Sequence, residues 1–200
     1  MGFGILLFGY FVVLGTLPSA LLFGNFLIIV AFGTSVILVC ALKLLSGYNV
    51  YFRIAFAVSI VFSALLLASI PFETRDFGDQ VNIVYSVISR TARYIILLAL
   101  HNFLLQAIRT LARSIGNKKI AKKARRNLVV TYIYFIFTVF AFFDAPGDII
   151  AIAAVVFGIL LFALNFALFY SCYMRITYEG HDEEVERKYN EREEKRKRGK

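Results

Sequence analysis

Long apolar segments alternate with short polar ones along the chain. Met1 to Leu42 contains no charged residue, and further apolar runs recur from Ile54 onward. Because about 20 apolar residues in a helix cross the hydrocarbon core of a bilayer, the pattern predicts an all-α, multi-pass membrane protein. We expect about six transmembrane helices in three hairpins, near residues 2–17, 26–45, 54–70, 87–108, 128–143 and 149–174.

The polar segments between these runs set the expected turns. The first is expected near 18–25 and the second over 46–52. A polar loop over 71–80 and a turn over 144–148 each carry a net charge of −2, whereas a loop within 109–126 is strongly basic. Residues 1–174 then form the transmembrane bundle. Residues 175–200, with several Glu-to-basic pairs four positions apart, form a charged helical tail.

Composition supports a membrane protein and excludes several other classes. The chain is 60% hydrophobic, against about 45–50% in soluble domains. Cys40 and Cys172 both lie inside apolar runs and form no C-x-x-C motif, which argues against a disulfide framework or a metal site. No positive residue precedes the first apolar run, so we expect a retained span and no cleaved signal peptide.

The segment Arg109–Arg126 orients the predicted bundle. It contains eight Lys or Arg residues and no acid, and such clusters between spans stay on the cytoplasmic side. Both termini are then cytoplasmic, in a plasma membrane. Orientation alone accounts for the cluster, but its charges also suit anionic headgroups or an acidic protein partner. The candidate contact residues are Lys118, Lys119, Lys122, Lys123, Arg125 and Arg126.

The fourth predicted span carries the most unusual polar residues, Arg90, Arg93 and His101. Around a helix, Arg90 and His101 point within about 20° of each other, and Arg93 lies about 60° from Arg90. A charge inside the bilayer is costly and usually has a partner. We therefore expect Arg90 or Arg93 to pair with Asp144 or Asp148. The alternatives are snorkelling to the outer interface and an anion site.

Other polar and small residues predict contacts between helices. His101, Asn102, Gln106, Asn25 and Asn165 are expected to hydrogen-bond neighbouring helices. Small residues recur every four positions in two predicted spans, where they permit close helix packing or a homo-oligomer. These two stripes are Ala55, Ser59 and Ser63, and Ala163, Ala167 and Ser171.

No sequence motif identifies a specific activity. The chain has no G-x-S-x-G, H-E-x-x-H or P-loop motif, so no catalytic residue, cofactor or metal ligand is predicted. It has no soluble basic domain of the kind that binds nucleic acid. We favour a non-enzymatic scaffold, sensor or accessory component. The alternative is a small transporter or channel whose cavity, lined by Arg90, Arg93 and His101, favours anions; a membrane-embedded enzyme ranks last.

Overall fold

The computed structural model describes residues 2–9, 26–74, 79–142, 148–176, 187 and 191. These residues form helices joined by short turns, and the described part contains no strand, which confirms the all-α prediction there. Residues 2–9 are helical. The longer helices are α2 (Phe26–Leu45), α3 (Val50–Thr74), α4 (Asp79–Ser114), α5 (Lys118–Phe142) and α6 (Asp148–Ile176). Residues 10–25, where the first predicted span and its turn continue, lie outside the described part.

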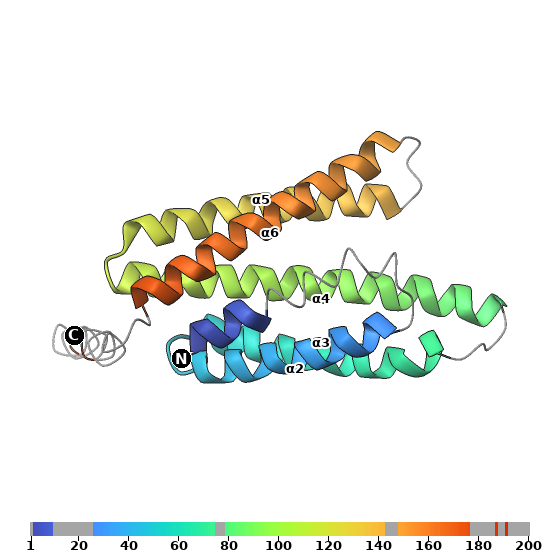
Figure 1. The fold of residues 1–200 in the computed structure, drawn as a ribbon, viewed down its shortest axis with the longest axis horizontal. Coiled ribbons are helices and arrows are strands. Elements are labelled where there is room, and N and C mark those ends of the chain that lie inside the picture. Colours follow the sequence, from blue (N-terminus) through green and yellow to red (C-terminus); the bar gives the residue numbers. More distant parts are fainter. Residues whose placement is uncertain are drawn as a thin grey trace.

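Helix α4 is the longest element and lies between two antiparallel hairpins, α2–α3 and α5–α6 (Figure 1). Each helix packs against the next one along the chain. At one end, the segment 2–9 packs against the bundle, where the rings of Phe3 and Phe52 meet edge to face with centroids 6.1 Å apart. The prediction of three hairpins in sequence is not confirmed, because α4 contacts both α3 and α5.

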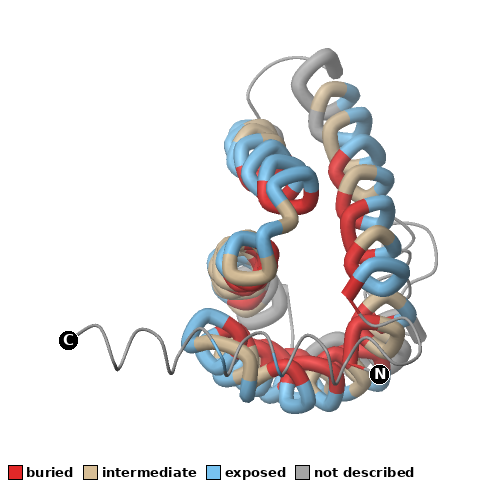
Figure 2. The backbone as a smooth tube through the Cα atoms, turned by 90° about the vertical axis from the view of Figure 1, so that its left-hand side faces the viewer, coloured by how far each residue is buried: buried red, intermediate tan, exposed pale blue. Residues whose placement is uncertain are grey.

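Three described stretches are long and apolar enough to cross a membrane: Val50–Pro71, Val87–Ser114 and Val155–Ile176. The apolar stretch Ala31–Leu45 in α2 is shorter. Buried positions follow the inward sides of the helices and exposed positions follow the outward sides (Figure 2). Many of the exposed side chains are large and apolar, a surface that suits lipid better than water. Together these features indicate a membrane protein.

Burial along the α5–α6 hairpin is concentrated in the half of the bundle where α4 ends and α5 begins. Among the described residues, Phe135 is the last buried side chain along α5 and Leu161 is the first along α6. Toward their shared turn, both helices expose apolar side chains instead, although Phe137 and Phe157 stack with ring centroids 5.1 Å apart. Of the described residues, few therefore surround the outer part of this hairpin.

Helices α4 and α5 are joined by a three-residue turn, 115–117, so the prediction of a long basic loop is wrong. Gly116 has φ 79°, which glycine adopts without steric cost. The Asn117 amide donates to the Ala112 carbonyl at 2.7 Å. The Gly116 amide donates to the Arg113 carbonyl at 3.1 Å. These two bonds close α4 as a Schellman motif. Asn117 Oδ1 then accepts the Ile120 amide at 3.2 Å and caps α5.

The two ends of α3 also differ from the predicted boundaries. Asn49 Oδ1 accepts the Phe52 amide at 3.0 Å and caps α3, so this helix begins at Val50, inside the turn expected over 46–52. At its other end α3 includes Pro71, where the expected loop was to begin. The bounds of α2 coincide with the predicted 26–45, and α6 extends the predicted 149–174 by a few residues.

The two small-residue stripes have different environments. Ala55, Ser59 and Ser63 are all buried, as expected for close packing of α3. Ala163 and Ala167 are exposed. Among the residues that the structure describes, the second stripe therefore does not serve as a helix-packing surface.

Candidate functional site: the basic end of the bundle

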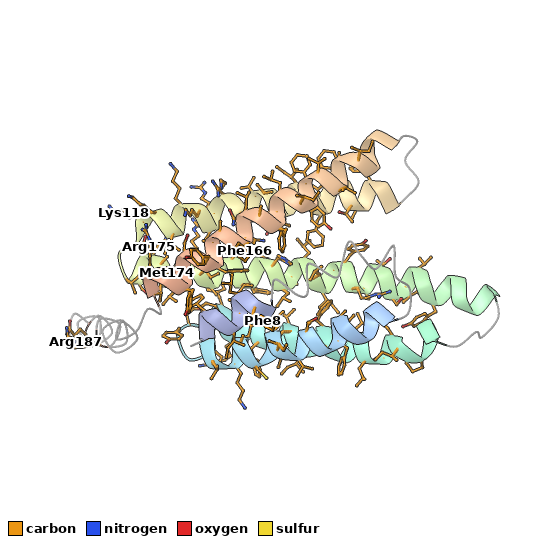
Figure 3. The ribbon with its side chains drawn as sticks, viewed as in Figure 1. Phe8, Lys118, Phe166, Met174, Arg175 and Arg187 are labelled. Atoms are coloured by element: carbon orange, nitrogen blue, oxygen red, sulfur yellow. The ribbon has the colours of Figure 1, made fainter. Side chains whose placement is uncertain are left out.

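Cations from every long helix gather at one end of the molecule, which we call the basic end. Because the helices alternate in direction, α2, α4 and α6 finish there, while α3 and α5 begin there (Figure 1). Lys118 and Arg175, from α5 and α6, lie at this end in Figure 3. The basic end comprises Lys43, Arg53, Arg109, Arg113, Lys118, Lys119, Lys122, Lys123, Arg125, Arg126 and Arg175.

The first turns of α5 present these charges in a fixed way. Ile120, Ala121 and Ala124 are buried and hold one face of the helix against the bundle. The six candidate contact residues predicted from sequence lie on the remaining faces, and all six are exposed. The helix therefore holds six cations on a fixed backbone, which a flexible loop would not do.

The cations of α4 and α5 have no acidic neighbour in sequence. Between Asp79 and Asp144 the chain contains no Asp or Glu. The helix contacts of α4 and α5 with each other therefore bring no negative charge to the basic end. Like charges repel each other and attract anions.

Buried amides fix α5 against α6 close to these charges. Asn127 Nδ2 donates to the Leu164 carbonyl at 2.8 Å and to Asn165 Oδ1 at 2.9 Å. Both asparagines are 0% exposed. Lys123 precedes Asn127 by four positions, and Ser171 follows Asn165 by six. Between these two, Lys123 Nζ donates to Ser171 Oγ at 3.1 Å. The expected interhelical role of Asn165 is confirmed, and its partner is in α5.

Further side chains connect α4 to both of its neighbours. Tyr132 Oη donates to Asn102 Oδ1 at 3.0 Å between α5 and α4, which confirms the interhelical role expected of Asn102. Asn49 Nδ2 donates to the Ala107 carbonyl at 3.0 Å between α3 and α4. These bonds fix the positions of the three helices relative to one another near the basic end.

The polar residues of the fourth predicted span lie elsewhere. Arg93 donates from Nε to the Ser89 carbonyl at 3.3 Å, within its own helix. His101 is 4% exposed; its Nδ1 donates to the Leu97 carbonyl at 2.8 Å and its ring meets Phe135 edge to face. Arg93 and His101 are eight positions apart, about 12 Å along α4.

The predicted ion pairs cannot be placed in this arrangement. The side chains of Arg90 and Asp148 lie outside the described part of the chain, as does Asp144 altogether. The pairing of an arginine of α4 with the 144–148 turn stays a prediction.

Sequence reasoning missed Asn49, Asn127 and Tyr132. Asn127 stands at the change from the basic to the apolar part of α5, with Thr131 one turn later also buried. Two polar residues four positions apart in an apolar helix, such as Asn127 and Thr131, could have indicated a buried face of α5. No comparable pattern singled out Tyr132, because the fifth predicted span is rich in aromatic residues.

The chemistry available at the basic end is electrostatic. Across the residues for which side chains are described, no group of three or more His, Cys, Asp or Glu residues could hold a metal ion. Comparison with known proteins adds no assignment: no protein-family model, no curated protein and no solved structure matches the chain.

Proposed function

We propose that this chain is a six-span plasma-membrane protein with both termini in the cytoplasm, acting as a non-enzymatic scaffold or accessory component. The observation that supports it best is the segregation of charge along the bundle. Eleven cations lie at the basic end, whereas α4 begins at Asp79 and α6 begins at Asp148, at the opposite end. The positive-inside rule places the basic end in the cytoplasm.

In a six-span arrangement, α5 must cross the membrane with a short apolar part. Its apolar part after the cations and Asn127, residues 128–142, has 15 positions, about 22 Å of helix against a core of about 30 Å. The cations nearest the apolar part must then extend their side chains toward the headgroups, as long Lys and Arg side chains do at helix ends. Exposed Arg125 and Arg126 are in the position to do so.

The described polar groups favour a scaffold over a transporter. A transport path would need the polar side chains of α4 to face water inside the bundle. His101 is buried against Leu97 and Phe135, and Asn102 is bonded to Tyr132. These side chains are used in holding helices together, and the basic end remains as the surface available to a partner.

Thiol accessibility distinguishes a scaffold from a transporter. In a background lacking Cys40 and Cys172, single cysteines replace Arg93, Leu97 or His101, and a polar, membrane-impermeant thiol reagent is added to intact cells. We expect no labelling at positions 97 and 101, because Leu97 is 6% exposed and His101 is 4% exposed within the bundle.

A lipid-facing position provides the control. Ile95 is 64% exposed, so a cysteine there should also stay unlabelled, but for the different reason that lipid covers it. Labelling at position 101 with position 95 unlabelled would show an aqueous path into the bundle. That result would reject the scaffold in favour of the transporter.

A further inference from the structure

The seam between α4 and α5 at the basic end combines a cationic part with an apolar part. We define this seam by Asn102, Arg109 and Arg113 on α4 and by Arg125 and Tyr132 on α5. We propose that it binds an anionic phospholipid, with the phosphodiester on the arginines and the acyl chains along exposed apolar side chains of α5. The inference rests on the proposed function, since it requires the basic end to lie at a membrane surface.

The contact between Tyr132 and Asn102 sets the register of the seam. Tyr132 Oη lies 3.0 Å from Asn102 Oδ1. Arg109 follows Asn102 by seven positions, and Arg125 precedes Tyr132 by seven. Seven positions return a helix to within about 20° of the same face and advance it by about 10 Å. Because α4 and α5 are antiparallel, both arginines are displaced in the same direction and lie level with each other on the seam.

Arg109 provides an independent sign that an anion belongs there. Its Nε is buried, and no group in the described part of the chain hydrogen-bonds to it. Arg113, one turn further along α4, and Arg125 are exposed. Neither helix supplies an acid between Asp79 and Asp144. Guanidinium groups bind phosphate oxygens through two parallel hydrogen bonds, so a phosphodiester fits this cationic part.

The apolar part of the seam explains why the ligand is a lipid. From Arg125 toward the C-terminus of α5, Val129, Tyr132, Ile136 and Val139 follow at spacings of three and four, on one side of the helix. Their side chains are between 42% and 55% exposed. A ligand with an anionic head and apolar chains matches the whole stripe, whereas an acidic protein or free phosphate would use only its cationic end.

Lipid binding is measured on the full-length protein in mixed detergent micelles by native mass spectrometry. The probes are phosphatidylglycerol and phosphatidylcholine with identical acyl chains. We expect phosphatidylglycerol to be retained preferentially. The double variant Arg113→Gln/Arg125→Gln should weaken its apparent Kd by about 30-fold, from about 1 kcal/mol per cation.

The matched control removes the same charge from the same helix. Lys119 and Arg126 are exposed. Around α5 they lie about 120° and about 100° from Arg125, away from α4. Lys119→Gln/Arg126→Gln should change the apparent Kd by less than about 3-fold, since a change below about 0.7 kcal/mol is expected outside the bound headgroup. Equal losses in the two double variants would mean unspecific surface attraction and would overturn the proposal.

Two competitors test the other ligands. Inorganic phosphate and poly-glutamate should both fail to displace phosphatidylglycerol, since neither can use the apolar part. Displacement by phosphate would show a simple anion site, and displacement by poly-glutamate would favour an acidic protein; either result overturns the lipid site. The C-terminal tail, residues 175–200, contains both acidic and basic residues and is present throughout, so a tail that occupied the seam would abolish the lipid preference. Micelles have no sides, so this result is independent of the membrane orientation in the proposed function.

Discussion

Replacing Phe52 by Ala should lower the free energy of unfolding by about 3–5 kcal/mol, the cost of truncating a buried aromatic side chain. Phe52 is 0% exposed and meets Phe3 edge to face, so α3 and the N-terminal helical segment both lose contacts with it. Reversible unfolding by sodium dodecyl sulfate in mixed micelles measures the change. In lipid, packing supplies this stability, because apolar side chains gain little by leaving a hydrocarbon solvent.

Phe140→Ala is the matched control for Phe52→Ala. Phe140 is 55% exposed on the outer part of α5. The Phe140 ring contacts apolar chains of the micelle both before and after unfolding. The substitution should therefore change the free energy of unfolding by no more than about 0.5 kcal/mol. A loss at Phe140 as large as that at Phe52 would mean that another protein surface covers this face.

The second large effect is expected at the amide pair between α5 and α6. Asn127→Leu removes the donor to Asn165 Oδ1 and to the Leu164 carbonyl, inside a contact where both asparagines are fully buried. Deleting one partner of a buried hydrogen bond costs about 1–3 kcal/mol. The same unfolding assay measures it.

A double-mutant cycle isolates the pair. Asn165→Leu and the combination Asn127→Leu/Asn165→Leu complete the cycle, and the double variant should lose less than the sum of the single losses. The coupling should be about 0.6 kcal/mol and should not exceed about 1.7 kcal/mol, the average and the maximum from double-mutant cycles on hydrogen bonds between membrane helices. Strict additivity would show that the two amides do not depend on each other and would contradict the hydrogen bond between them.

The apolar pattern predicted most of the helices because membrane-spanning segments have a strong length and composition signal. The bounds of α2 agree with the predicted 26–45. The predicted span 87–108 lies within α4, Asp79–Ser114, which extends beyond it at both ends. Small residues on α3 correctly indicated a buried face, because Ala55 and Ser59 permit close packing.

The basic segment was wrongly predicted to be a loop, because its high charge was given more weight than its helix-stop, helix-start and helical-spacing patterns. Gly116 followed by Asn117 combines a helix-stop residue with a helix-start residue. Ile120, Ala121 and Ala124 repeat at helical spacing. Considered apart from the cations, these residues predict a short turn followed by a helix, which is what the structure shows.

The sequence did not predict which polar side chains on different helices bond to each other. Asn165 was identified as a residue that bonds another helix, but its spacing within α6 cannot specify that the partner is Asn127. Similarly, nothing in the sequence of α4 alone places Arg109 level with Arg125. Such relations depend on the register between two helices, which the turn at Gly116 sets through its length.

The most direct test of the account is the side of the membrane on which the basic end lies. Single cysteines are introduced as Lys119→Cys and Asp148→Cys in a background lacking Cys40 and Cys172, and intact cells are treated with an impermeant thiol reagent. We expect labelling at position 148 in intact cells, and at position 119 only after the membrane is permeabilised. Labelling at position 119 in intact cells would contradict the cytoplasmic placement of the basic end, and with it the proposed function.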